Sequence, residues 1–230
     1  MQPASIATTA APPQYYVSID LETTGLDPHT NGICQIGACV FNASGELVTV
    51  FVSDCCPSSD FINEEAVYPF MPEHVIVVTK EALELNGFTL ERIYDAPGIG
   101  YVLQKFLNWL KPYSGQTPIA VFHNAPFDVG FLKRSFARAG IDPGRLLRRV
   151  RDTATMSPDV YGEGNYPRSL EEICKREGIE KVNNHDGLHD ALATGKAFFS
   201  LKAKLDDRRP GTVENLFFHF NKLNTGGFAT

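Results

Sequence analysis

A chain of 230 residues with 43% hydrophobic and 21% charged side chains has the composition of an ordinary folded protein. These values exclude wholesale disorder, collagen and coiled coil, and no stretch reaches the roughly 20 unbroken apolar residues of a membrane-spanning helix. The net charge of −6 at pH 7 argues against a uniformly basic nucleic-acid coat. We expect one domain over residues 15–205, with a disordered lead-in at 1–14 and a tail at 206–230.

The cysteines give information about the compartment. They are odd in number and lack the spacing of metal ligands or of a disulfide framework: Cys34, Cys39, Cys55, Cys56 and Cys174. The lead-in also lacks the basic segment and the long apolar core of a secretory signal. Both observations predict a reducing, cytoplasmic location.

The hydrophobic pattern predicts strands first, and then helices that alternate with short strands. Three consecutive, mostly antiparallel strands are expected at 15–19, 33–41 and 46–52. Helices are expected at 79–85, 97–110, 127–139, 169–176 and 188–205, with short strands at 119–122 and 150–153. Ser169 and Glu172 have capping-box spacing, and Pro126 is expected as the first residue of its helix. This order is typical of an α/β protein with helices on the faces of a mixed sheet.

Basic residues are concentrated in the later part of the chain. No Lys or Arg precedes Lys80, and the densest basic group is Lys133, Arg134, Arg138, Arg145, Arg148, Arg149 and Arg151. Such a group is either a solvated helical face or a surface that follows the phosphates of a nucleic acid. The sequence alone favours neither.

Four carboxylates fall at the ends of predicted strands and the starts of predicted helices. Asp20 and Glu22 end the first strand two residues apart, so both side chains point to one face of the sheet. Asp128 lies in the first turn of a helix that follows a buried strand, and Asp190 lies near the start of the last helix. Burying like charges together is costly unless cations neutralise them, and Mg²⁺ and Mn²⁺ prefer carboxylate oxygens. The pattern is consistent with a two-metal phosphoryl-transfer site.

Three segments carry a resemblance to a known family. They are SIDLETTGL at 18–26, HNAPFDVGFL at 123–132 and HDGLHDA at 185–191. In this order they resemble the three exonuclease motifs of the DEDDh family of 3′–5′ exonucleases, and the resemblance spans about residues 15–205. It implies a ribonuclease-H-like α/β fold, with a five-stranded mixed sheet flanked by helices and its first three strands antiparallel.

The resemblance also implies roles for individual residues. The metal ligands, for two Mg²⁺ or Mn²⁺ ions, would be Asp20, Glu22, Asp128 and Asp190. His185 corresponds to the general base. The positions that contact the terminal nucleotide correspond to Thr23, Leu26, His123, Asn124 and Phe127. His189 stands where an aspartate is common in relatives, which makes it a second candidate for the base.

The activity implied is stepwise hydrolysis at a free 3′ end of nucleic acid, with release of nucleoside 5′-monophosphates and single-stranded DNA as the favoured substrate. RNA trimming or cleavage of short oligoribonucleotides is an alternative, because such enzymes share these motifs. A catalytically silent end-binding module is another, which the intact set of acids argues against. Residues 213–218 faintly resemble peptides that bind sliding clamps, so a polymerase or clamp partner is a further hypothesis. No membrane partner is expected, and the sequence does not determine the oligomeric state.

Overall fold

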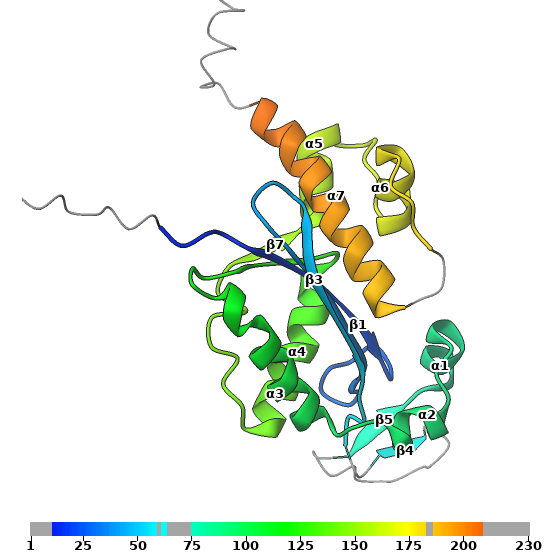
Figure 1. The fold of residues 1–230 in the computed structure, drawn as a ribbon. Coiled ribbons are helices and arrows are strands. Elements are labelled where there is room, and N and C mark those ends of the chain that lie inside the picture. The colour runs from blue at the N-terminus through cyan, green and yellow to red at the C-terminus, as the bar shows by residue number, and fades with distance from the viewer. Residues whose placement is uncertain (1–10, 59–60, 64–74, 183–185, 209–230) are drawn as a thin grey trace, which may run out of the picture.

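The computed structural model describes residues 11–58, 61–63, 75–182 and 186–208. Its centre is a five-stranded sheet in the order β3-β2-β1-β6-β7 (Figure 1). The strands are β1 (Tyr16–Thr23), β2 (Ile33–Phe41), β3 (Leu47–Asp54), β6 (Ile119–Phe122) and β7 (Val150–Asp152). The first three strands are antiparallel, whereas β6 and β7 run parallel to β1. The predicted mixed sheet with an antiparallel first half is confirmed.

Helices cover both faces of this sheet (Figure 1). One face is covered by α3 (Ile99–Leu110) and α4 (Ala125–Ala139), and the other by α7 (Gly187–Asp207). Two further helices, α5 (Thr153–Tyr161) and α6 (Leu170–Glu177), pack against α7. The remaining elements are α1 (Lys80–Asn86), α2 (Leu90–Asp95), the 3₁₀ turn Lys111–Tyr113, and a small parallel sheet of β4 (Phe61–Asn63) and β5 (Ile76–Val78). Among the described residues, no helix is both long enough and apolar enough to cross a membrane.

Side chains of the central strand β1 belong to two hydrophobic clusters, one on each face of the sheet. Val17, Ile19 and Leu21 lie in the cluster that packs against α3 and α4. Tyr16 points the other way, with its ring 5.3 Å from that of Phe198 on α7. Because successive strand residues point to opposite faces, the even-numbered residues that follow Tyr16 also face α7.

The two predicted helix-start signals have different outcomes. Ser169 and Glu172 form both hydrogen bonds of the capping box at the start of α6. The expectation for Pro126 was wrong by one residue. It is the second residue of α4, because the helix begins at Ala125.

Several short elements were absent from the prediction: α2, α5, β4 and β5. Sequence pattern does not favour α5, since it contains β-branched residues and the internal Pro158. It forms because the carboxylate of Asp152 accepts the backbone N–H of Ala154 and because Val160 is buried against α7. Here packing outweighs intrinsic propensity.

The α7 helix lies unusually close to the sheet because glycines face each other across the contact. A Cβ built on Gly37 of β2 would lie 2.0 Å from the carbonyl carbon of Gly187, and one on Gly195 would lie 2.2 Å from the Phe41 ring. No side chain fits at these positions. This contact fixes the first turn of α7, and therefore the place of Asp190 in that turn.

The ends of the chain are described only in part. Residues 11–14 are described, and the side chain of Gln14 donates a hydrogen bond to the carbonyl of Thr117 at 3.2 Å. Residues 1–10 and 209–230 lie outside the described residues, and with them the clamp-like segment at 213–218. The predicted domain boundaries at 14 and 205 stay predictions.

Candidate active site

Asp20 and Glu22 lie on the second half of β1, on the face that α7 covers. Glu22 is 9% exposed and pairs across the strands with Gln35 of β2. β6 pairs with β1 only as far as Ser18, so no strand continues the sheet beside the residues that follow. The start of α4 occupies this position. The structure thus places the two acids where the sheet opens, at the carboxyl end of its central strand.

Asp128 enters the same region from the first turn of α4. Its side chain is only 4% exposed. Hydrogen bonds from its own backbone N–H and from that of Leu21 favour the charged form of the carboxyl. The link to Leu21 connects α4 directly to β1, between Asp20 and Glu22.

Asp190 completes the group from the first turn of α7, which begins after the N-cap Asp186. Its Oδ1 atom lies 2.7 Å from the Nζ atom of Lys181, and each of these side chains is 13% exposed. Lys181 belongs to the connection between α6 and α7. No sequence pattern marks this lysine, because its place beside an acid nine residues later depends on how that connection folds.

The acids influence one another electrostatically. Burial, together with the negative charges of Asp128, Glu22 and Asp190, raises the pKa of Asp20 well above its usual value. Burial and neighbouring acids raise the pKa of Glu22 to about 7 and that of Asp128 to about 8. Lys181 opposes this effect at Asp20 and Glu22. The four predicted carboxylates therefore form one interacting group, drawn from β1, α4 and α7.

The donor chemistry of this group suits a hard divalent cation, because oxygen ligands with excess negative charge are what Mg²⁺ and Mn²⁺ bind. In the part of the chain that the structure describes, no three His, Cys, Asp or Glu side chains are yet arranged to hold a metal ion. Lys181 supplies positive charge at Asp190 instead. The four carboxylates therefore suit a divalent ion in their chemistry, and in this structure Lys181 neutralises part of their charge.

The raised pKa values predict how the stability of the metal-free protein depends on pH. In the folded state Glu22 and Asp128 bind protons more tightly than in the unfolded chain, where their pKa values are near 4.5 and 3.8. The folded state therefore holds more protons between about pH 4 and pH 8, and its stability falls as pH rises through that window. In EDTA we expect the melting temperature to fall by more than about 5 °C between pH 5.5 and 8.5.

The matched control for this measurement is the double variant Glu22→Gln and Asp128→Asn, whose side chains do not titrate. Its melting temperature should change clearly less over the same range. A wild-type melting temperature that rises from pH 5.5 to 8.5 would contradict the assigned pKa shifts.

A cavity of about 590 Å³ opens beside Glu22. Three of the predicted nucleotide-contacting residues line it, namely Thr23, Leu26 and Phe127. Leu26 is 82% exposed, as expected of a side chain that is free to contact a ligand. The opposite wall is formed by α1, which contributes Ala82 and Leu85. The helix itself was predicted at 79–85, but its place against the cavity was not, because no local pattern shows which element a short helix faces.

Thr23 and its neighbours hold the shape of this cavity. The hydroxyl of Thr23 donates a 2.7 Å hydrogen bond to the carbonyl of Gly25. A Cβ at Gly25 would lie within 2.5 Å of the Asn31 side chain, so only glycine fits the turn. The Asn31 amide in turn donates to the carbonyl of Val77 in β5. The small parallel sheet thus supports the turn that presents Leu26.

The structure places His123 and Asn124 outside the lining of this cavity. The Nδ1 atom of His123 lies 2.9 Å from the hydroxyl of Thr153, and burial lowers the pKa of the imidazole. Asn124 is exposed with a φ of 65°, and its backbone N–H donates to Asp152. Both residues hold the β6–α4 loop against α5 in this conformation, rather than contacting the space beside Glu22.

The two candidate bases differ in what the structure shows of them. His185 lies outside the described residues, so its assignment stays a prediction. His189 is on α7 with a half-exposed side chain, and its Nδ1 atom lies 3.2 Å from Asp186 Oδ1. Asp186 is also the N-cap of α7, so its carboxylate contacts both the backbone of the first turn and the His189 imidazole.

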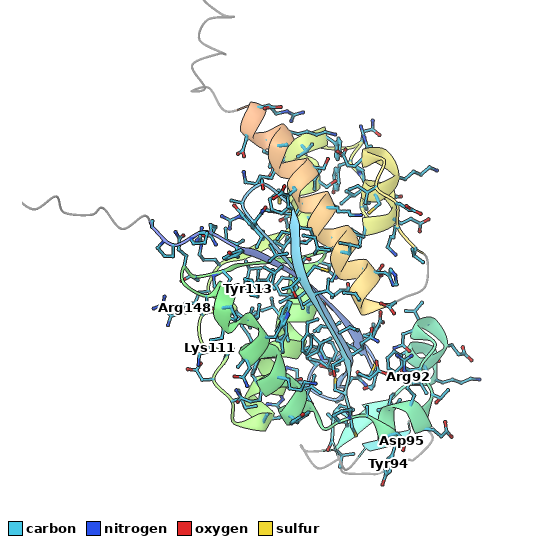
Figure 2. All side chains as sticks on the ribbon, viewed as in Figure 1. Arg92, Tyr94, Asp95, Lys111, Tyr113 and Arg148 are labelled. Carbon is cyan, nitrogen blue, oxygen red and sulfur yellow. The ribbon has the colours of Figure 1, made fainter. Side chains whose placement is uncertain are left out.

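A hydrogen-bonded chain ties the start of α7 to the rest of the site. The backbone N–H of Gly187 donates to the Gln35 side chain at 2.8 Å, and Gln35 donates to Asp54 at 2.8 Å. Arg92 of α2, labelled in Figure 2, binds both carboxylate oxygens of Asp54 at 2.7 and 2.9 Å. Gln35 is almost completely buried, so this network positions the helix that carries Asp190.

The side chains of the basic group predicted between 133 and 151 do not all face solvent in the same way, because some of them bind other parts of the protein. The guanidinium of Arg138 donates to the backbone carbonyls of Asn31 and His29, and that of Arg149 donates to Gln14. Arg148 is exposed on the surface (Figure 2). Some of these charges therefore support loops of the protein, and their role toward phosphates stays a prediction.

Comparisons with known proteins agree with this geometry. The family model described as RNase_T exonuclease matches residues 17–198. A PolC-type DNA polymerase III from Oceanobacillus iheyensis is 31% identical over 209 residues, which are 91% of this chain and 13% of that protein. The PolC-type enzyme from Bacillus cereus is 30% identical, over 91% of this chain and 12% of its own length. The chain thus spans about an eighth of these relatives.

Solved structures show the same fold. A zinc-bound complex of E. coli exonuclease I with single-stranded DNA superimposes with a TM-score of 0.64 and 20% identity, over 91% of this chain and 44% of that one. Exonuclease I from Methylocaldum szegediense gives a TM-score of 0.63 and 18% identity, over 86% of this chain and 41% of the other. These likenesses establish the ribonuclease-H-like architecture predicted from the motifs.

Proposed function

The chain belongs to the exonuclease family, and from this premise we propose that it removes nucleotides one at a time from the 3′ end of a nucleic acid, with single-stranded DNA as its preferred substrate. The observation that carries the proposal is the convergence of four acids, from β1, α4 and α7, beside an apolar cavity of about 590 Å³. That volume suits a small ligand such as a terminal nucleotide. The PolC-type relatives are DNA polymerases, and the similar E. coli exonuclease I structure holds single-stranded DNA, which supports DNA over RNA.

In this proposal the site residues have three kinds of role: binding the terminal nucleotide, holding metal ions and accepting a proton. Leu26 and Phe127 hold the terminal base, and Thr23 fixes the turn beneath it. The four carboxylates, Asp20, Glu22, Asp128 and Asp190, would hold two Mg²⁺ or Mn²⁺ ions. When bound, such ions activate water and stabilise the leaving 3′ oxygen. His185 accepts the proton of the attacking water, a task suited to a side chain with an ordinary pKa near 6.5.

The test is product analysis on 5′-labelled single-stranded DNA and RNA 20-mers of the same sequence and on dinucleotides and trinucleotides, with Mg²⁺, Mn²⁺ or EDTA, together with a binding assay on the 20-mers. We expect a metal-dependent ladder that shortens from the 3′ end, faster on DNA. Faster shortening of RNA would select the RNA-trimming alternative. Cleavage of dinucleotides and trinucleotides alone would select the short-oligoribonucleotide alternative. Binding of 3′ ends with no cleavage under any of these conditions would select the silent module.

The role of His185 has its own prediction. Replacing His185 by alanine should lower the rate by about 10²–10⁴-fold at pH 7.5, because the general base is lost while the carboxylates remain. His189→Ala serves as the matched comparison and should retain most of the activity. The reverse pattern, with His189→Ala the more damaging change, would make His189 the base. Single-turnover rates on the same DNA 20-mer measure both.

Two further proposals concern the cellular location and a partner protein. All five cysteines are free thiols and four are buried, which supports a reducing, cytoplasmic location. A polymerase partner is supported by the PolC-type relatives, in which the matching segment is a small part of a polymerase. Co-purification of the full chain with replication proteins of its own organism tests that partnership.

A further inference from the structure

Lys181 occupies an unusual position for a lysine. Its ammonium lies 2.7 Å from Asp190 Oδ1, with both side chains 13% exposed. The same charge also acts on Asp20 and Glu22, which come from β1. A lysine that merely stabilised the surface would be solvated and would face one acid.

The ion pair has a clear physical reason in the absence of metal. Four carboxylates in one partly dry space repel one another, and an unpaired buried charge is costly. An ammonium on a flexible four-carbon stem neutralises part of this charge without requiring a fixed geometry. Among the described residues, Arg92 is the other basic side chain that acts on Glu22, and it is held by Asp54 on the far side of Gln35.

The same position conflicts with a divalent ion. A metal on the Asp190 carboxylate would lie about 2.0–2.2 Å from one of its oxygens, within a few ångströms of the ammonium. Two cations so close in a partly buried site repel each other strongly. Metal binding through Asp190 is therefore expected to displace Lys181 from this carboxylate.

We propose that Lys181 is the resident cation of the metal-free site, which neutralises the carboxylates until a divalent ion replaces it, and that this exchange sets the affinity for metal. The inference rests on the proposed function, since it concerns the same carboxylates. It makes Lys181 a positioning residue that acts through Asp190. As a consequence, filling the site requires a higher concentration of the divalent ion than the four carboxylates alone would require.

The experiment measures Mn²⁺ binding by isothermal titration calorimetry to the full chain at pH 8.5, where protons compete less for the carboxylates. Lys181→Met removes the charge at similar length, and we expect it to bind Mn²⁺ at least about tenfold more tightly than the wild type. In EDTA its melting temperature should be lower than that of the wild type, and the rise on adding Mn²⁺ should be larger. Lys181→Arg keeps the charge and should restore wild-type affinity.

The control variant is Lys175→Met, which makes the same change at an exposed lysine of α6 and should leave the affinity within twofold. An affinity of Lys181→Met that is unchanged or weaker would overturn the proposal. If turnover also fell, the lysine would instead contact the substrate phosphate. A nuclease assay that fails while Lys181→Met still binds Mn²⁺ more tightly would remove the proposed function and leave this inference standing.

A second measurement needs no variant, should Lys181→Met fail to fold. Wild-type protein is treated with an amine-acetylating reagent with and without Mn²⁺, and the modification of Lys181 is followed by peptide mass spectrometry. When Mn²⁺ releases Lys181 from Asp190, the acetylation rate of Lys181 should rise several-fold, while that of Lys175 stays constant. A Lys181 rate that is unchanged or lower with Mn²⁺ would contradict displacement.

Discussion

Replacing Asp128 by asparagine is expected to lower turnover by roughly 10³-fold or more, equivalent to about 4 kcal/mol of transition-state stabilisation, while the fold survives. The change removes one negative charge from the interacting carboxylates at nearly constant volume. The amide oxygen can still accept hydrogen bonds from the backbone N–H groups of Asp128 and Leu21 that hold the carboxyl now. Single-turnover cleavage of a labelled DNA 20-mer with Mn²⁺ measures the loss.

The same variant should become more stable when metal is absent. The pKa of Asp128 is raised to about 8, so at pH 8.5 the wild type must carry a charge that its surroundings disfavour. Asp128→Asn removes that cost, and its melting temperature in EDTA should exceed that of the wild type. Asp95→Asn, at an exposed acid of α2 labelled in Figure 2, is the control and should change neither quantity. Retention of most activity by Asp128→Asn would refute the two-metal assignment.

Replacing Gly37 by alanine is expected to cause the largest loss of stability from a single added methyl group. The new Cβ would lie 2.0 Å from the carbonyl carbon of Gly187 and 2.3 Å from the backbone nitrogen of Leu188. Both are backbone atoms, so α7 must move away from β2 as a whole. We expect a cost of about 3 kcal/mol, which corresponds to a fall in melting temperature of roughly 10 °C.

Activity should fall in the Gly37→Ala variant as well, because Asp190 lies in the helix turn that is displaced. Urea unfolding gives the free energy, and the cleavage assay at a temperature where the variant is folded gives the activity. Gly100→Ala is the control, since its Cβ would meet Ala139 at an ordinary 3.7 Å in the first turn of α3. It should be neutral or slightly stabilising. A melting temperature of Gly37→Ala within 2 °C of the wild type would contradict the close contact.

The strands of the five-stranded sheet and the acids of the site were predictable because their signals are local. The period-2 alternation of β1 places Asp20 and Glu22 on one face, whatever lies opposite. The bounds of β2 and β6 were predictable because both segments are mostly apolar, and all nine residues of β2 are buried, the polar Gln35 among them. Asp128 and Asp190 were found through the helices whose first turns they occupy.

The remaining features depend on contacts between distant segments, which no local pattern encodes. His123 stands only five residues before Asp128 in the sequence, yet its ring lies against the hydroxyl of Thr153, thirty residues later. Lys181 and Gln35 looked like ordinary polar residues, and their roles arise only when α7 docks on the sheet. A side chain that acts through a partner far along the chain becomes visible only in three dimensions.

The order in which the chain supplies its carboxylates has a consequence for synthesis on the ribosome. Asp20, Glu22 and Asp128 are made before Asp190, which belongs to α7, the last helix that the structure describes. α7 also covers β1 and β2, so without it that face of the sheet stays open. A nascent chain that ends before α7 therefore has an incomplete acidic group and an unfinished core. The acidic group is therefore complete only after α7 has left the ribosome, and until then the growing polypeptide lacks one of the four carboxylates on which the proposed cleavage depends.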